Sequence, residues 1–357
     1  MIKKNQRHIT LILLLNFVFQ TALAQTQPTR LQSTTQLALS YYNAKDFEKA
    51  APLLYEVYEL SKNNYYFRLY LTSLIELQRF EEAEAQIKKE IKKLRSPSPE
   101  LQIHWGYLLK TQGNKKEAEQ KYTEALNMTS TDRPTIMMVA NAFTQWQEFE
   151  WTKKVYLKAR RENSEEHFSY ELALAYMYLR DYEQMMEEYL NLIAHDEKQL
   201  QRVESALSSA MRIDVDNSLR TSFRTQVLKR IQAEPNVIGY NRLLIWFFLQ
   251  EKQFAGALRQ SIALDKRTGE EDMQIYQLGQ MALNNSVFNE AERAFNYLVE
   301  KGENAPLFIP ANEQKIHAAY LRFKSENNQS REEAEKLADM FEKGLETLGY
   351  IAATLNL

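Results

Sequence analysis

Hydrophobic residues recur along the chain at helical spacing, and one short pattern returns about every 34 residues. The pattern is an aromatic residue, an alanine three positions later, an apolar residue four further on, and a small or apolar residue three beyond that. It is clearest at Phe47-Ala50-Leu54-Val57 and at Phe288-Ala291-Phe295-Leu298. Offsets of three and four place these residues on one face of an α-helix. The chain is therefore expected to consist of repeated helices.

The alanine position of this pattern falls at residues 50, 83, 118, 152, 185, 257 and 291, with spacings of 33, 35, 34, 33, 72 and 34. The longest spacing corresponds to two units, so a degenerate unit is expected within it. A second apolar pattern precedes the first, with a small residue at Ala38, Gly106, Ala140, Ala173 and Gly279. Short polar segments separate the two patterns, and Asp46 and Asp181 are expected to cap the helices that follow them.

This arrangement resembles the tetratricopeptide repeat family, whose unit is a 34-residue helix-turn-helix with an aromatic and alanine signature in its second helix. The resemblance covers about 31–195 and 238–300. The chain departs from the family pattern at the proline that usually closes each unit, and at Thr152, Met185 and Ser261. The resemblance implies an all-α fold, an α-α superhelix in which antiparallel helix hairpins stack as a solenoid.

The repeats suggest a division of the chain. We expect a signal peptide at 1–24, repeats one to five at 25–195, a degenerate helical hairpin at 196–236, further repeats at 237–301, and an irregular helical pair at 302–357. The degenerate hairpin has the apolar stripes Leu200, Val203, Leu207, Met211 and Leu219, Phe223, Val227, Ile231. The apolar end 350–357 suggests either that the natural chain continues or that this end docks on a repeat or on a partner.

The first 24 residues have the three parts of a secretory signal peptide. Lys3, Lys4 and Arg7 precede an apolar stretch, and Ala22-Leu23-Ala24 provides a cleavage site. The alternative is an uncleaved membrane anchor, but the stretch has 16 residues, whereas a spanning helix needs about 20. We therefore expect an exported protein that begins at Gln25, periplasmic in a Gram-negative bacterium and secreted otherwise.

Composition narrows the class further. Hydrophobic residues make up 44% of the 357 residues and charged residues 26%, which excludes a mostly disordered chain. A mean hydropathy of −0.53 excludes a polytopic membrane protein. Removal of the signal would leave 42 basic and 47 acidic residues, a balance that argues against nucleic-acid binding. Because the chain has no cysteine, disulfides and lipid attachment to cysteine are excluded.

The sequence shows no motif for catalysis or for a cofactor. No two histidines have the spacing of a helical zinc site, and the common nucleotide-binding and nucleophile motifs are absent. The segment from Asp214 resembles the start of a calcium loop, but Leu219 and Thr225 occupy its glycine and glutamate positions. Asp216 or Asn217 is therefore interpreted as a helix cap. We expect a protein that is not an enzyme and binds neither metal nor cofactor.

In the resembling family the first helix of each unit lines a concave face that binds a peptide or protein. Carried onto this chain, that face includes Arg68, Tyr107, Asn141, Tyr170, Arg242, Trp246, Tyr276 and Gln280. The family's clamp for a carboxyl terminus is absent, because Thr35 and Leu39 occupy its first positions. The competing interpretation is that several of these aromatic side chains pack between repeats.

The resulting hypothesis is an exported, non-catalytic scaffold that binds a protein or peptide partner on its concave face, with a role in envelope assembly, transport or secretion. Two alternatives stay open. The first is a glycan-binding envelope component, since exposed Trp and Tyr side chains can stack on sugars. The second is the N-terminal portion of a longer protein with an activity beyond residue 357. The sequence identifies neither the partner nor the oligomeric state.

Overall fold

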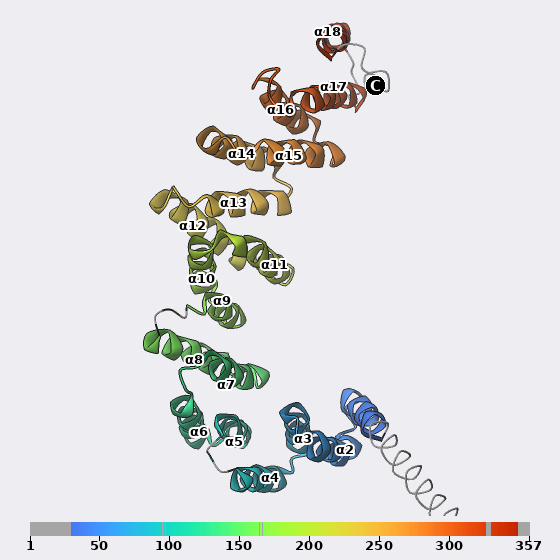
Figure 1. The fold of residues 1–357 in the computed structure, drawn as a ribbon. Coiled ribbons are helices and arrows are strands. Elements are labelled where there is room, and N and C mark those ends of the chain that lie inside the picture. The colour runs from blue at the N-terminus through green and yellow to red at the C-terminus, as the bar shows by residue number, and fades with distance from the viewer. Residues whose placement is uncertain are drawn as a thin grey trace, which may run out of the picture. The chain divides into compact units, whose positions relative to one another are not determined.

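The computed structural model describes residues 30–94, 96, 98–163, 165, 167–325 and 330–348. All regular structure in these residues is helical, as the all-α prediction required (Figure 1). The expected signal peptide at 1–24 and the apolar end 350–357 lie outside the described residues. The chain divides into a first unit, 1–167, and a second unit, 168–357, and each is described by itself.

The first unit consists of helix pairs joined by short turns. A helix at 30–43 precedes α2 (Phe47–Ser61), and these are followed by α3 (Asn64–Glu76), α4 (Phe80–Lys93), α5 (Pro99–Thr111), α6 (Lys115–Met128), α7 (Arg133–Gln145) and α8 (Phe149–Glu162). The helices within each pair are antiparallel neighbours, and α5 also packs against α3 and α7. The first helices of successive pairs therefore form a continuous layer.

The second unit repeats this scheme with one irregular pair. Its helices are α9 (Ser169–Tyr178), α10 (Tyr182–His195), the 3-10 turn η1 (Glu197–Gln199), α11 (Leu200–Met211), α12 (Ser218–Ala233), α13 (Ile238–Gln250), α14 (Phe254–Thr268), α15 (Asp272–Asn284), α16 (Phe288–Val299), α17 (Phe308–Ser325) and α18 (Arg331–Leu348). The irregular pair consists of α11 and α12. Its second helix, α12, packs more extensively against α10 and α13 than against α11.

The repeated signature residues form the buried interior of the pairs. The alanines at 50, 83, 118, 257 and 291 are at most 1% exposed, and Thr152 and Met185 are buried at the same repeat position. Ser261 is buried at the next signature position, four residues after Ala257. Gly106 shows why small residues are needed on the first helix, since a Cβ there would lie 2.4 Å from the ring of Tyr122. The period in the sequence thus corresponds to helix contacts made at close range.

Caps and turns separate the paired helices. The side chains of Asp46 and Asp181 accept hydrogen bonds from the backbone of Lys49 and Gln184, which confirms both predicted N-caps. The turn between the two helices of a pair contains a residue with positive φ at Lys45, Gln78, Gly113, Gln147, Arg180, Asn217, Lys252 and Ser286. Non-glycine residues at most of these turns explain how so many pairs are built with few glycines.

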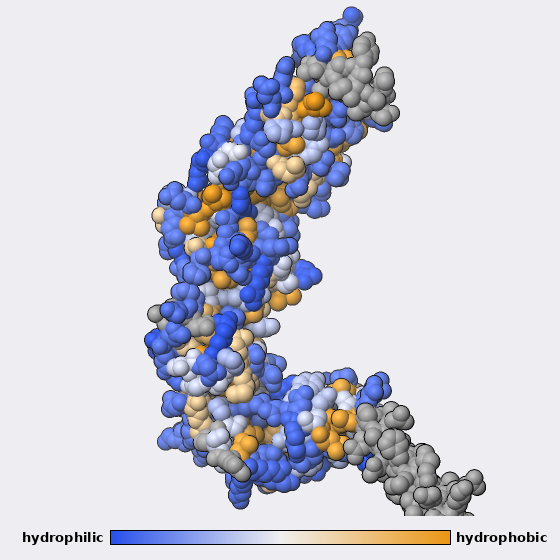
Figure 2. Space-filling model, in the orientation of Figure 1, coloured by the Kyte–Doolittle hydropathy of each residue, from blue (hydrophilic) through white to orange (hydrophobic). Residues whose placement is uncertain are grey.

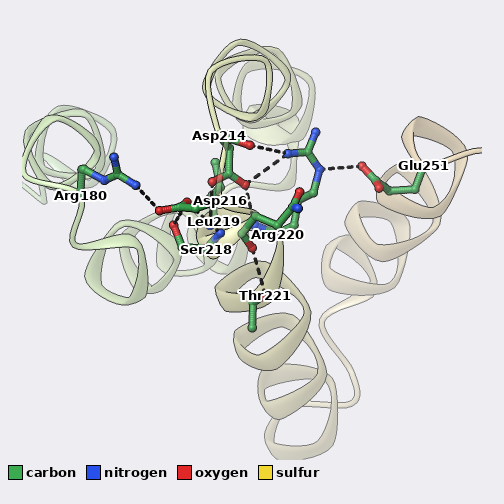
Figure 3. Close-up of polar contacts among 9 residues, drawn as sticks. Arg180, Asp214, Asp216, Ser218, Leu219, Arg220, Thr221 and Glu251 are labelled. Carbon is green, nitrogen blue, oxygen red and sulfur yellow. Dashed lines mark hydrogen bonds and ion pairs between the residues drawn. The ribbon is translucent and has the colours of Figure 1, made fainter.

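The segment from Asp214, which resembled the start of a calcium loop, forms the turn at which α12 begins (Figure 3). Asp216, one residue before the N-cap, accepts from the backbone N–H of Ser218 at 3.2 Å. Asn217 adopts a left-handed conformation and makes no side-chain cap bond. The larger contribution comes from Asp214, which the sequence analysis did not identify as a cap. It accepts from the N–H groups of Leu219 and Arg220, each at 3.3 Å.

Candidate groove in the second unit

Three first helices of the second unit, α11, α13 and α15, surround a cavity of about 320 Å³. One residue of α14 completes it. The lining residues are Leu200, Glu204, Arg242, Ile245, Trp246, Leu249, Ser261, Glu271, Gln274, Gln277, Leu278 and Met281. Because the cavity opens on the layer of first helices, it lies on the face to which the repeat pattern assigned the partner. We call it the α11–α13–α15 groove.

The wall of this groove is largely apolar. Leu200 approaches from α11, Ile245 and Leu249 from α13, and Met281 from α15. Trp246 is the only tryptophan of the second unit. It is partly buried, and its ring centroid lies 6.4 Å from that of Phe223 on α12. An apolar wall with a few polar groups is typical of a ligand site.

Arg242 is held on one side of the groove by two carboxylates. Its guanidinium nitrogens lie 2.7 Å from Glu197 of η1 and 2.7 Å from Glu271, which precedes α15. Only 2% of the Glu271 side chain is exposed, so this ion pair is buried on one side. The backbone N–H of Glu271 donates to Asp265, and Asp265 also accepts from the hydroxyl of Tyr297 at 2.7 Å. These contacts fix the position of Arg242 and compensate its positive charge.

Glu204 is the second charged group that lines the groove. It lies on α11 and is partly buried, and its side chain makes no hydrogen bond or ion pair with any residue in the described part of the chain. Burial raises the pKa of its carboxyl to about 7, from an ordinary value of 4.5. A carboxylate that is partly removed from water and has no partner favours a cation or a hydrogen-bond donor beside it.

The other predicted site residues of the second unit do not line this groove. The ring of Tyr170 lies between two neighbours, with the guanidinium of Arg202 3.5 Å from its centroid and Tyr189 at 6.0 Å. Tyr276 packs edge-on against Phe295 at 5.5 Å. Gln280 lies one helical turn beyond Tyr276 on α15 and is partly buried. Of the predicted set, Arg242 and Trp246 therefore line the groove together.

In the first unit the predicted residues are spread along the layer of first helices. Tyr107 stacks on Trp146, with ring centroids 4.1 Å apart and an interplanar angle of 21°. Burial, followed by the charge of Glu148, raises the pKa of Tyr107. Arg68 is partly buried with its guanidinium 5.5 Å from the ring of Tyr65, and Asn141 is exposed. Tyr107 thus contributes to packing between repeats as well as to the surface.

Sequence reasoning missed several residues of the groove, chiefly Glu204, Glu271, Gln274, Gln277 and Met281. The position of Glu204 in the sequence could have indicated that it lines the groove. It lies four residues after Leu200 and three before Leu207, on the same helical face as the apolar stripe that predicted this helix. Burying a glutamate within an apolar stripe costs free energy unless its carboxylate gains a polar or charged partner. Glu271 left no comparable signal, because its burial depends on α13 and α14.

The described residues also line a second, larger cavity of about 720 Å³, formed by α14, α16 and α17. They contain no group of three or more His, Cys, Asp or Glu side chains that could hold a metal ion. None of the helices in the described ranges is long and apolar enough to cross a membrane. On the face that Figure 2 shows, hydrophilic residues predominate and hydrophobic residues form separate small patches.

No family model matches the chain, and no curated protein matches it. Solved structures do. The complex titled Naa15/Naa10 bound to HypK-THB matches with a TM-score of 0.29 and 15% identity, over 89% of this chain and 52% of that one. The Cut9-Hcn1 hetero-tetramer of APC/C matches with a TM-score of 0.27 and 13% identity, over 88% and 56%. The present chain thus spans about half the length of each of these two.

A third match is the C-terminal part of a TPR repeat-containing protein from Cytophaga hutchinsonii. Its TM-score is 0.23 and its identity 14%, over 84% of this chain and 98% of that one. The tetratricopeptide-like architecture of the present chain is visible in its own helix pairs, which follow one another at intervals of 33 to 35 residues over most of the described sequence.

Proposed function

We propose that this chain is an exported, non-catalytic scaffold that binds a peptide segment of a protein partner on the layer of first helices. The observation that carries the proposal is the α11–α13–α15 groove. Three first helices contribute to it, and its lining combines six apolar side chains with six polar ones, of which Arg242 is fixed by ion pairs. Such a surface recognises shape and a small number of polar contacts.

The dimensions of the groove suit a peptide better than a large ligand. A cavity of about 320 Å³ is at the lower end of the range for small-molecule pockets. It holds one or two side chains, while the backbone of a bound segment would follow the layer of first helices beyond it. Trp246 is placed to be an anchor, since large amphipathic aromatics account for much of the energy at binding hot spots.

The export part of the proposal is supported by the basic, apolar and Ala-x-Ala segments in residues 1–24. We propose a role for the exported scaffold in envelope assembly, transport or secretion. Mass spectrometry of the protein purified from its own host tests the first step. A mature chain that begins at Gln25 is expected, and an intact Met1 on membrane-bound protein would point instead to an uncleaved anchor.

Site-directed photocrosslinking tests the binding face. A photoreactive phenylalanine analogue is placed at Gln274 or Gln277, exposed groove residues of α15, and separately at Arg259 or Lys266, exposed residues of α14. Crosslinking is carried out in the native host. We expect both groove positions to capture the same protein and the two α14 positions to capture it weakly or not at all.

The complementary variant is Trp246→Ala in the crosslinking background, with circular dichroism to show that its helix content is kept. Loss of the crosslinked species from this variant would support the groove. Equal capture from α14 and α15, or capture from α14 alone, would place the partner on the other face. If no protein is captured at any of the four positions, the scaffold proposal is wrong.

A further inference from the structure

We propose that the α11–α13–α15 groove accepts a basic side chain of the bound segment, with arginine preferred, and that Glu204 is the group that selects it. This inference rests on the proposed function, because it names the chemistry of the segment that the scaffold binds. Three observations carry it: an unpaired acidic side chain in the groove, an arginine already neutralised by other carboxylates, and an aromatic ring in the lining of the same groove.

The charges around the groove do not balance. Glu204, Glu197 and Glu271 supply three carboxylates, and Arg242 supplies one guanidinium. Arg242 is bound to Glu197 and Glu271 on its own side. On α11 itself the nearby Arg202 lies over the ring of Tyr170. Among the described residues, Glu204 is therefore left without a compensating cation, and a bound basic group would supply one.

The apolar wall matches the remainder of such a side chain. Arginine buries a three-carbon stem along apolar surface while its guanidinium reaches a polar group. Leu200, Ile245 and Leu249 provide that surface, and Trp246 provides a ring on which a guanidinium can stack. An acidic side chain would meet the same wall but would be repelled by Glu204, so the groove discriminates by charge as well as by fit.

The test uses the full mature chain, 25–357, labelled with 5-fluorotryptophan. The protein has four tryptophans, and the fluorine resonance of Trp246 is the one lost in Trp246→Phe. Two probes are titrated: N-acetylarginine methylamide, and N-acetylcitrulline methylamide, which has nearly the same shape without the charge. We expect the Trp246 resonance to shift with the arginine compound and to require about tenfold more of the citrulline compound.

The variant Glu204→Gln separates charge from shape, because it keeps the size of the side chain. It should abolish the preference for arginine over citrulline. Glu183→Gln, an exposed glutamate of α10, removes the same charge elsewhere in the second unit and should leave the preference unchanged. Equal affinity for the two probes in the parent protein, or a preference that survives Glu204→Gln, would overturn the proposal.

A third probe addresses glycans, the other macromolecular class. If an N-acetylglucosamine trimer shifts the Trp246 resonance and the arginine compound does not, the groove holds a sugar and the basic-side-chain proposal is wrong. The outcome is distinguishable from failure of the scaffold proposal, which is read from crosslinking to a protein at Gln274 and Gln277. A captured protein without arginine preference would retain the scaffold and refute only the selection by Glu204.

Discussion

The guanidinium of Arg220 lies 3.2 Å from the carboxylate of Asp214, across the turn at which α12 begins. The Asp214 side chain is fully buried and also accepts two backbone N–H groups of the first turn. Arg220 in turn reaches Glu251, at the end of α13, at 3.0 Å (Figure 3). One buried carboxylate therefore caps α12 and, through Arg220, links the irregular pair to the next one.

Replacing Asp214 by alanine is expected to lower the free energy of unfolding of the second unit by about 2 kcal/mol, because a helix cap and a buried acceptor are lost together. Asp216→Ala is the matched control. The side chain of Asp216 is 57% exposed, so its removal should lower the free energy of unfolding by less than the removal of Asp214 does. Hydrogen exchange of peptides from 218–233 gives the measurement, and equal protection in the two variants would refute the ranking.

Gly106→Ala tests the close contact between α5 and α6. The added methyl would lie 2.4 Å from the ring of Tyr122, whose hydroxyl donates to the buried Glu148 at 3.1 Å. Displacing that ring should lower the free energy of unfolding by about 1–3 kcal/mol. The higher helix propensity of alanine offsets part of this loss.

Gly256→Ala on α14 is the comparison, because its methyl would lie 3.0 Å from the nearest atom, on the ring of the partly buried Phe248, which is a looser contact. Chemical denaturation followed by circular dichroism compares the two. A Gly106→Ala protein as stable as Gly256→Ala would show that the helices can separate without loss.

Trp146→Phe tests a buried hydrogen bond of the first unit. The indole N–H of Trp146 donates to Nδ1 of His104 at 2.8 Å, and His104 is 1% exposed. Burial, followed by the positive charge of Arg68, lowers the pKa of His104 to about 3, so the ring is a neutral acceptor at ordinary pH. The variant leaves that acceptor without a hydrogen-bond donor, which should lower the free energy of unfolding by about 1–3 kcal/mol.

Trp105→Phe provides the control, since the indole N–H of Trp105 is buried without a hydrogen-bond partner in the described structure. Its loss should therefore cost less than the loss of the Trp146 donor. Thermal unfolding of the two single variants measures the difference. The assignment of the hydrogen bond fails if Trp105→Phe is the more destabilised protein.

Glu204→Gln should raise stability, and the gain should depend on pH. The pKa of Glu204 is about 7 in the folded chain against 4.5 ordinarily, so the unfolded chain loses this proton first as pH rises. The parent therefore loses stability between about pH 4.5 and 7, and glutamine removes that loss. Because the groove side of Glu204 reaches solvent, we expect a gain of about 1–2 kcal/mol at pH 8.

At pH 3.5 the carboxyl of Glu204 is largely protonated in both the folded and the unfolded chain, so the variant should match the parent there. Melting temperatures of both proteins at pH 3.5 and pH 8 provide the measurement. A gain of the same size at both pH values would show that packing rather than charge is responsible.

Much of the fold was predictable because the repeat is a local property of the chain. The 33–35-residue period, the helix pairs and the caps Asp46 and Asp181 depend on residues within a few turns of one another. The turns were less predictable. Left-handed positions such as Gln78 and Lys252 carry no glycine, so their backbone conformation is imposed by the two helices they connect.

The candidate site was predictable only in part. The repeat register assigned Arg242 and Trp246 to the same helix face, and both line the groove. The pairing of Arg242 with the buried Glu271, the isolation of Glu204 and the stacking of Tyr107 on Trp146 each depend on side chains from different helix pairs. The sequence by itself determined which face of each helix is apolar, since that follows from 3.6-residue periodicity. The tertiary structure alone decided which charges meet and which one is left uncompensated, because burial and partners come from neighbouring repeats.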